Sequence, residues 1–313
     1  MFFGCTSLTT VDIPGSVVYI GNGAFYDCVK LASVSLPANV KYIGDAAFYG
    51  CSSIKTIVIP SAVTEIGQNA FSGCSSLVSV SIPSKVKVIS DGMFADCAAL
   101  KAVTIPAGVT EIGKYVFENC VALTAVQIPA GVTVISDGLF SGCSALTSVN
   151  IPENVTYIGE FAFANCKVLP SVDVPSNVTF IGACAFANCS KFTAIAIPSG
   201  VTTIEAGTFL GCSELLAVNI PAEVTSIGNG AFSGCSKLVV FYIPEKVTHI
   251  GRYAFDGCSS LAGITFAKTE GWWYADTDTA TSGTAVASTD IANSSTVAEY
   301  LTDTYKDMFF NRT

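Results

Sequence analysis

Thirteen cysteines are the residues of this 313-residue chain with the most chemical potential, and twelve of them recur every 23 residues. Thiols at a fixed spacing could form disulfides or bind a soft metal ion. If the repeats stack like neighbouring strands, equivalent cysteines lie about 4.8 Å apart, within the Cα range of a disulfide. The twelve, called the ladder cysteines below, are Cys5, Cys28, Cys51, Cys74, Cys97, Cys120, Cys143, Cys166, Cys189, Cys212, Cys235 and Cys258.

Geometry and spacing favour an inert role for the ladder cysteines. Stacked equivalents would point in parallel into the interior, whereas a disulfide requires crossed side chains. The sequence also contains no C-x-x-C pair, the spacing that is typical of a structural zinc site. We therefore predict twelve reduced, buried thiols that act as small apolar residues.

The other candidates for catalysis are few. Cys184 lies outside the ladder, in a variable turn, and we expect a partly exposed but inert thiol there. His249 is the only histidine, so any Ser-His-Asp or Cys-His site would have to include it, yet its repeat position is variable. Three aspartates recur every 46 residues, about 10 Å apart in a stack, which is too far to share one calcium ion. They are Asp45, Asp91 and Asp137. We predict no catalytic residue, no metal site and no cofactor.

Composition narrows the class of protein. Half of the residues are apolar and 12% are charged, which supports a continuous packed core. The net charge is −9, and the sequence contains no basic stripe. Both features argue against a nucleic-acid partner. No stretch approaches the roughly 18 apolar residues that a membrane helix needs, so we expect no membrane insertion. Phe2 already occupies the phenylalanine position of the repeat, so we expect that upstream sequence is missing.

The repeat itself changes periodicity within its 23 residues. It reads C-x-x-L-x-x-V-x-I-P-x-x-V-x-x-I-G-x-x-A-F-x-x. Val80 and Ile82 alternate with serines, which predicts a strand, and Pro83 ends it because proline cannot donate to a ladder. The segment from Phe71 to Cys74 is too short for a stable helix and predicts a 3₁₀ or single helical turn. A lone coil cannot offset its loss of backbone entropy, so the repeats must stack.

The residue before each ladder cysteine predicts a corner of the coil. Only glycine, asparagine and aspartate occur there, from Gly4 and Asp27 to Gly257. These residue types tolerate positive φ, so we expect a left-handed conformation at each of these twelve positions.

The motif carried by Leu77, Val80, Ile82, Pro83, Ile89 and 94–97 resembles the BspA-like leucine-rich repeat, also called the Treponema pallidum type. The resemblance covers residues 2 to about 266. It implies an α/β, β-rich leucine-rich-repeat solenoid: a right-handed curved coil with a parallel sheet on its concave face, short second strands and 3₁₀ or helical turns. Members of the family are surface or secreted proteins of host-associated bacteria and some protozoa. They are implicated in adhesion to host matrix proteins or other microbes, without catalytic residues.

The regular pattern stops after Phe266, so we predict a solenoid over 1–266 and a C-terminal cap over 267–313. Residues 275–296 are rich in Thr, Ser, Ala and Asp and predict a loop, whereas 296–310 predict one helix that begins with a capping box at Thr296 and Glu299. Trp272 and Trp273, the only tryptophans, have two interpretations: part of the cap, or a small ligand site.

The outward positions of the first strand are the natural binding surface. They are small, weakly polar and nearly uncharged, except near the C-terminal end, where they become apolar at Leu216, Val239, Val240 and Tyr242. Exposed apolar patches mark interaction sites, although drift beside the cap would produce the same pattern. The aromatic pairs Tyr157–Phe180 and Tyr19–Tyr42 on the convex side form a second candidate, with stacking between coils as the alternative.

The sequence thus favours a non-enzymatic protein-interaction or adhesion scaffold, and the resemblance implies a location outside the cell or on its surface. Its partner would be a host matrix protein or a microbial surface protein. The alternative is a carbohydrate-binding surface protein, in which Tyr242 or Trp272 would provide an aromatic platform. A hydrolase is a remote alternative, because it would depend on the variable His249.

Overall fold

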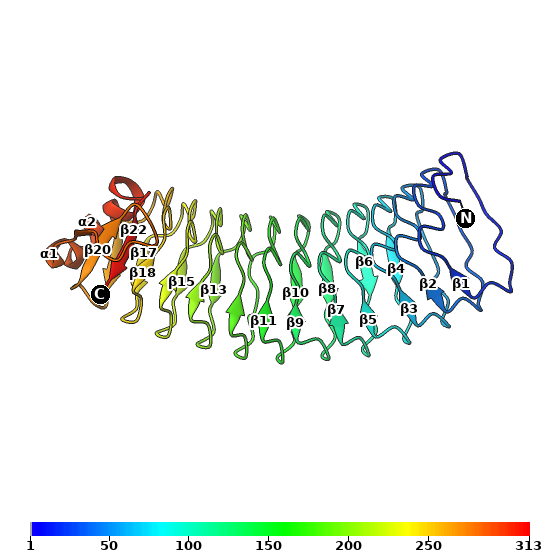
Figure 1. The fold of residues 1–313 in the computed structure, drawn as a ribbon, viewed down its shortest axis with the longest axis horizontal. Coiled ribbons are helices and arrows are strands. Elements are labelled where there is room, and N and C mark those ends of the chain that lie inside the picture. The colour runs from blue at the N-terminus through cyan, green and yellow to red at the C-terminus, as the bar shows by residue number, and fades with distance from the viewer. Residues whose placement is uncertain (1) are drawn as a thin grey trace. The chain divides into compact units, whose positions relative to one another are not determined.

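The computed structural model describes residues 2–313, and the chain forms two compact units, Met1–Val155 and Thr156–Thr313. Each unit is a stack of 23-residue coils that carry two rows of short parallel strands (Figure 1). This is the β-rich solenoid that the repeat predicts. The proposed boundary between a solenoid and a cap at residue 266 remains a prediction.

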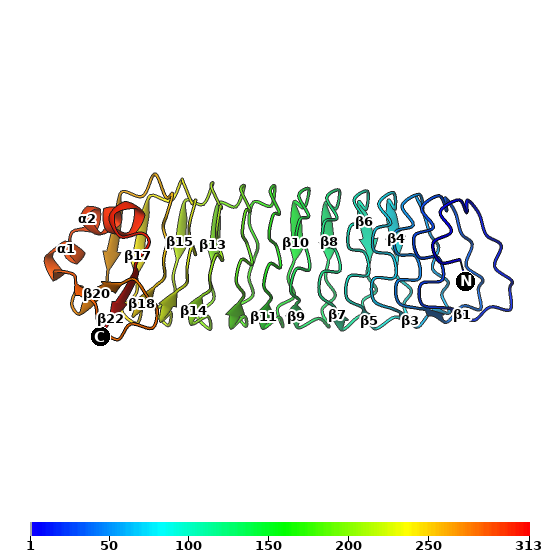
Figure 2. The same ribbon diagram turned by 45° about the horizontal axis from the view of Figure 1, so that its top comes forward.

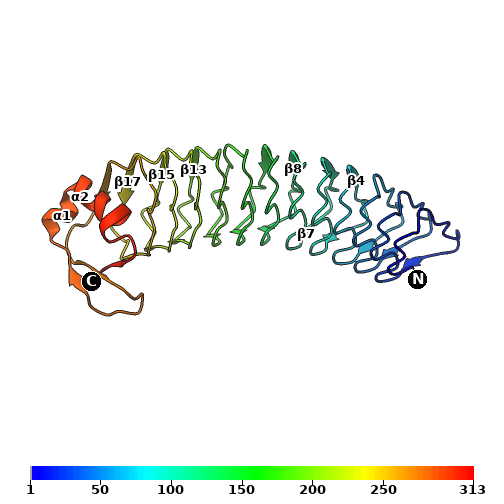
Figure 3. The same cartoon turned by 90° about the horizontal axis from the view of Figure 1, so that it is seen from above.

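In the first unit, the first-row strands pair in register across one coil, for example Val80 with Val103. Side chains alternate as the sequence predicts: Val80 is buried between the exposed Ser79 and Ser81. The first-row strands are β4 (Ser79–Ser81), β6 (Ala102–Thr104), β8 (Ala125–Gln127) and β10 (Ser148–Asn150). The second-row strands are β1 (Tyr19–Ile20), β2 (Tyr42–Ile43), β3 (Glu65–Ile66), β5 (Val88–Ile89), β7 (Glu111–Ile112) and β9 (Val134–Ile135). Seen from above, β4 and β8 lie on one side of these coils and β7 on the other (Figure 3).

The second unit repeats this arrangement and extends one row. Figure 2 shows β13, β15 and β17 in one row, with β14 and β18 in the other. Its first-row strands are β13 (Ala194–Ala196), β15 (Ala217–Asn219), β17 (Val240–Ile243) and β19 (Gly263–Phe266). Its second-row strands are β11 (Tyr157–Ile158), β12 (Phe180–Ile181), β14 (Thr203–Ile204), β16 (Ser226–Ile227) and β18 (His249–Ile250).

The first row of strands is less complete than the repeat predicts. Among the described residues, no strand forms at 10–12, 33–35 or 171–173, and Thr56 makes only a single bridge to Ser79. The hydrophobic spacing therefore predicts which side chains point inward, but it does not predict whether the backbone at these positions forms strand hydrogen bonds.

The predicted corners are confirmed at all twelve positions before the ladder cysteines. Their φ angles range from 53° at Asp27 to 76° at Gly142. The coil also has a second left-handed position four residues earlier, which the sequence analysis missed. It holds glycine in several coils, as at Gly92 with φ of 61°, but alanine, asparagine, tyrosine, phenylalanine or cysteine in others, as at Ala46 with φ of 50°. The expected helical turn is thus a run of hydrogen-bonded turns with a left-handed residue at each end.

The core consists of ladders of equivalent side chains, one from each coil, and the phenylalanine and cysteine ladders are the most regular. Phenylalanine rings stack nearly parallel, with centroids 5.4 Å apart between Phe48 and Phe71 and again between Phe163 and Phe186. Such stacks contribute favourable packing beyond the apolar area that they bury.

The C-terminal segment differs from the prediction of one helix over 296–310. It contains α1 (Ser288–Ala292), α2 (Ser294–Glu299) and a π-helical turn, η1 (Tyr300–Thr304). The N-cap is Asn293, whose side chain accepts a hydrogen bond from the Thr296 amide at 3.2 Å, so the predicted capping box at Thr296 is wrong.

The last part of the predicted helix is a strand, β22 (Phe309–Arg312). It pairs antiparallel with β18 on one side and with β20 (Trp272–Ala275) on the other. A short strand β21 (Thr284–Ala285) completes this six-stranded sheet, so the expected loop over 275–296 contains both a strand and a helix. The open edge of β18 binds β22, and this non-local pairing is not visible in the helical pattern of the sequence.

Candidate functional site

The first-row strands near the C-terminal end of the second unit present a cluster of exposed apolar side chains. In β17, Phe241 and Ile243 are buried, whereas Val240 and Tyr242 are 62% and 54% exposed. Leu216 and Val239 occupy the same place in successive coils, directly before β15 and β17, and both are exposed. We call Leu216, Val239, Val240 and Tyr242 the apolar patch. Proteins rarely leave contiguous apolar side chains exposed without a use for them.

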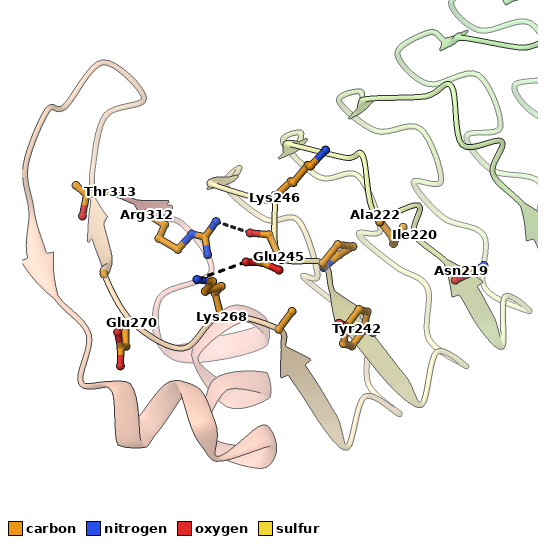
Figure 4. A pocket seen from close by; sticks show the side chains of 13 residues that line it. Asn219, Ile220, Ala222, Tyr242, Glu245, Lys246, Lys268, Glu270, Arg312 and Thr313 are labelled. Carbon is orange, nitrogen blue, oxygen red and sulfur yellow. Dashed lines mark hydrogen bonds and ion pairs between the residues drawn. The ribbon is translucent and has the colours of Figure 1, made fainter.

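A hollow of about 1070 Å³ adjoins the patch at Tyr242. Figure 4 shows that its walls come from the ends of β15 and β17, the turn after β19, and β22. The residues that line it are Asn219, Ile220, Ala222, Tyr242, Pro244, Glu245, Lys246, Ala267, Lys268, Glu270, Gly271, Arg312 and Thr313. Its size is that of a cleft that could receive several side chains of a partner.

Charged side chains hold the wall of the hollow in place. Lys268 Nζ lies 3.4 Å from Glu245 Oε1, and the Arg312 guanidinium donates to the backbone carbonyl of Glu245 (Figure 4). The same guanidinium lies 5.8 Å from the centroid of the Trp272 ring, a cation–π arrangement. Lys268 and Glu245 are exposed and Arg312 is half-buried, so these pairings contribute little to stability but order the surface that a partner would meet.

These charged pairs were not predicted, although the sequence carries a simple signal for them. Three ion pairs of the second unit join residues that are 23 apart in sequence: Lys237 with Glu214, Lys246 with Glu223, and Lys268 with Glu245. Opposite charges at the spacing of the repeat therefore indicate neighbours in adjacent coils.

The structure separates the two tryptophans from the apolar patch, because they lie on β20 in the other row. Trp272 is 2% exposed, its indole N–H donates to the Lys268 carbonyl at 2.9 Å, and its ring meets Phe266 edge-on. Trp273 is half-buried beside a hollow of about 340 Å³, which Ser282 also lines. Its indole nitrogen is buried and has no hydrogen-bond partner among the described residues. Both tryptophans border this hollow, but Trp272 is almost wholly buried and acts as a packing residue, whereas Trp273 is the more accessible of the two.

His249 is half-buried on β18, and its surroundings are structural. Its Nδ1 lies 2.7 Å from Oδ1 of Asn311, the residue opposite it on β22, and its ring lies 5.7 Å from that of Phe309. The hydrogen-bond partner of the imidazole is therefore an amide rather than the hydroxyl or thiol of a nucleophile.

Most ladder cysteines are fully buried, and their thiols donate to backbone carbonyls 26 residues earlier, as Cys74 does to Phe48 at 3.3 Å. Burial raises the pKa of the Cys51, Cys120, Cys212 and Cys258 thiols to about 12. These protonated thiols are poor nucleophiles and poor metal ligands.

The prediction of twelve buried thiols is wrong at one position, because Cys5, in the first coil, is exposed. Cys184 is partly exposed, as expected. Its pKa is raised mainly by the partial burial of the thiol and to a smaller extent by repulsion from Glu160.

Residues 2–313, which the structure describes, offer neither a cluster of metal ligands nor a membrane-spanning helix. They contain no group of three or more His, Cys, Asp or Glu side chains that could hold a metal ion. Within the same residues, every helix is too short or too polar to cross a bilayer.

Comparisons with known proteins agree with the repeat. The model of the BspA type leucine rich repeat region matches in overlapping segments at residues 1–124, 64–193, 110–239 and 168–271. A leucine-rich repeat protein from Bacteroides ovatus is 32% identical, with a TM-score of 0.72 over 84% of this chain and 74% of that one. The leucine-rich repeat protein of T. pallidum is 38% identical, with a TM-score of 0.50 over 52% of this chain and 78% of that one.

A more distant likeness concerns the fold alone. The pneumococcal vaccine antigen PcpA is 21% identical, with a TM-score of 0.59 over 82% of this chain and 68% of that one. None of the curated proteins matches the sequence.

Proposed function

Because the chain belongs to the BspA-type leucine-rich-repeat family, we propose that it is a non-enzymatic scaffold that binds a protein partner at the cell surface or outside the cell. Leucine-rich-repeat solenoids commonly serve as extended binding surfaces, because stacked coils present many side chains on one continuous face. The partner class is a host matrix protein or a surface protein of another microbe, and the role is adhesion by a host-associated bacterium.

The observation that carries this proposal is the apolar patch next to the hollow at Tyr242. Tyr242 offers a large apolar ring with a polar tip, the kind of side chain that is enriched at interface hot spots. Val240 and Val239 extend the apolar area, and Leu216 continues it into the neighbouring coil. Lys268, Arg312 and Glu270 provide a charged rim on the hollow, which matches the usual arrangement of an apolar centre with a polar border.

A binding experiment tests the location and the function together. Purified matrix proteins such as collagen, laminin and fibronectin, and whole bacterial cells, would be immobilised and exposed to the protein. We expect one of them to bind, and we expect Tyr242→Ala to weaken that binding roughly tenfold, or about 1–2 kcal/mol. Val240→Ser should weaken it in the same direction. Folding should change little, because the side chain of Tyr242 points away from the core.

Tyr115→Ala is the matched control, because Tyr115 is an exposed tyrosine of the first unit outside the patch. It should leave the affinity unchanged. If the Tyr242→Ala and Val240→Ser variants bind like the unmodified protein, the site lies elsewhere, and Trp273 becomes the next residue to test. If none of the immobilised proteins or cells binds, adhesion is not the function.

A further inference from the structure

The second-row strands of the first unit carry two exposed tyrosines side by side. Tyr19 on β1 and Tyr42 on β2 are direct neighbours in the parallel register. Their side chains point outward, because Ile20 and Ile43 fill the inward positions, and they are 55% and 40% exposed. Two large aromatic rings are thus exposed on the second-row strands, in a part of the sequence distant from the apolar patch.

The two rings are splayed rather than stacked. Their centroids lie 6.3 Å apart and their planes make an angle of 46°. The aromatic pair at the same repeat positions of the second unit, Tyr157 and Phe180, packs face to face at 4.8 Å and 11°, and both residues are half-buried, less exposed than Tyr19 and Tyr42. Stacking between coils therefore explains Tyr157 and Phe180, whereas the rings of Tyr19 and Tyr42 do not stack on each other and remain exposed to a ligand.

A hollow of about 250 Å³ lies beside the splayed pair and is lined by polar groups. Asn22 accepts hydrogen bonds through Oδ1 from the Asp45 amide at 3.0 Å and from the Tyr19 hydroxyl at 3.3 Å. Asp45 accepts one through Oδ1 from the Gln68 amide at 2.8 Å. These bonds fix both side chains and still leave the Asn22 amide group as a donor and the second Asp45 oxygen as an acceptor.

Glu65 completes the wall, because it is the strand neighbour of Tyr42 on its other side. Among the described residues, neither Asp45 nor Glu65 forms an ion pair. Both carboxylates can therefore accept hydrogen bonds from a ligand, and their charge repels an anionic one.

Exposed, unstacked aromatic rings next to fixed donors and acceptors match the chemistry of a sugar. A pyranose ring has an apolar C–H face that packs on an aromatic ring, and hydroxyl groups around its edge that both donate and accept hydrogen bonds. We propose that Tyr19, Tyr42, Asn22, Asp45 and Glu65 form a binding site for a neutral oligosaccharide. The site is separate from the apolar patch and does not depend on the protein-binding function.

The test uses defined sugars and single substitutions. Cellopentaose, maltopentaose and chitopentaose would be titrated into the full chain, with binding followed by saturation-transfer NMR and calorimetry. We expect at least one of them to bind with a dissociation constant on the order of 1 mM or tighter. Tyr42→Ala and Tyr19→Ala should each weaken that binding roughly fivefold to tenfold, whereas Tyr42→Phe should keep most of it, because the ring supplies the contact.

Tyr157→Ala serves as the control at the equivalent repeat position and should leave sugar binding unchanged. Circular dichroism of each variant verifies that its coils remain folded. Choline and a heparin-derived pentasaccharide are the charged counter-probes. The proposal is overturned if none of the three neutral sugars binds at about 10 mM, if Tyr42→Ala binds as the unmodified chain does, or if only choline or the heparin fragment binds.

Discussion

The thiol of Cys97 donates a hydrogen bond to the backbone carbonyl oxygen of Phe71, 26 residues earlier, at 3.2 Å. The same contact recurs between coils of both units, for example from Cys212 to Phe186 at 3.1 Å. A cysteine at this position therefore fills a small apolar space and adds a second hydrogen bond to a carbonyl that already accepts one within its own turn, as Phe71 does from the Cys74 amide at 3.2 Å. The interior of the solenoid depends on these thiols remaining protonated.

This dependence predicts a loss of stability at alkaline pH. Burial raises the pKa of Cys120 from 9.0 to about 12, so the folded state keeps a proton that the unfolded chain releases above pH 9. The contribution is complete below pH 9 and disappears as the pH rises toward 12. Each such thiol should make the free energy of unfolding fall by about 1.4 kcal/mol per pH unit in this window.

Urea unfolding between pH 9.5 and 11 measures this effect. The free energy of unfolding should fall less steeply with pH for Cys120→Ala than for the unmodified chain, whereas Ser144→Ala should not alter the pH dependence. Equal slopes for all three proteins would disprove the assignment.

A second prediction concerns the corner before each ladder cysteine. Gly142 has a φ of 76°, and a Cβ placed on it would come within 2.3 Å of the Asn119 side chain in the neighbouring coil. Gly142→Val combines a β-branched residue at positive φ with this clash, so it should destabilise the protein by about 2–3 kcal/mol. Ser141→Val, at the adjacent half-buried position, should cost no more than about 0.5 kcal/mol. Denaturant midpoints measure both, and similar midpoints would contradict the role given to the corner.

The second left-handed position offers a stabilising change. Ala46 adopts a φ of 50°, which is strained for a residue with a Cβ and unstrained for glycine. Ala46→Gly should therefore raise the free energy of unfolding by about 0.5 kcal/mol, because relief of strain exceeds the added entropy of the unfolded chain. Ala99→Gly, at a position without positive φ, should have the opposite sign. A thermal melt in which both variants lose stability would show that the strain at Ala46 is negligible.

The fourth prediction is that residues 267–313 act as a cap. Ile264 and Phe266 are buried in β19, which packs against α2, and Phe266 also contacts Trp272. A protein that ends at Phe266 would expose these side chains and the edge of β18, so it should aggregate, because unpaired edges invite pairing with other chains. Deletion of 278–281 in the exposed hairpin loop is the matched control and should leave the protein monomeric. Light scattering distinguishes the two, and a monomeric truncated protein with an unchanged melting temperature would show that the segment is not a cap.

Much of this fold could be predicted from the sequence because each coil repeats the same pattern of apolar and turn-forming residues. The alternation around Val80 indicated the inward positions, and glycine, asparagine or aspartate before the ladder cysteines indicated the left-handed corners. The second left-handed position was missed because residues such as Ala46 carry no signal of positive φ. The neighbouring coil imposes it through hydrogen bonds such as that from the Ala46 amide to the Gln68 carbonyl at 2.8 Å.

The C-terminal segment and the hollow were harder to predict because they depend on contacts between distant residues. The predicted α-helix is correct only as far as Glu299, the last residue of α2, whereas Phe310 lies opposite Ile250 on β18, and no local signal identifies that partner. The exposure of Tyr242 followed from strand alternation, whereas the charged wall beside it required Arg312 to reach Glu245 across 67 residues. Trp272 and Trp273 are adjacent in sequence, yet only the structure distinguishes the buried ring from the accessible one.

The stacked phenylalanine rings have a consequence for how this kind of chain can change in length. Phe25 meets Phe48 at 5.1 Å, and Phe48 meets Phe71 at 5.4 Å, with the same chemistry on both sides of each ring. If 23 residues were lost by unequal recombination within one unit, the rings on either side of the gap would find an equivalent partner. Gene slippage in steps of one coil can therefore lengthen or shorten a unit while leaving its interior intact, so the length of the solenoid can evolve independently of the fold.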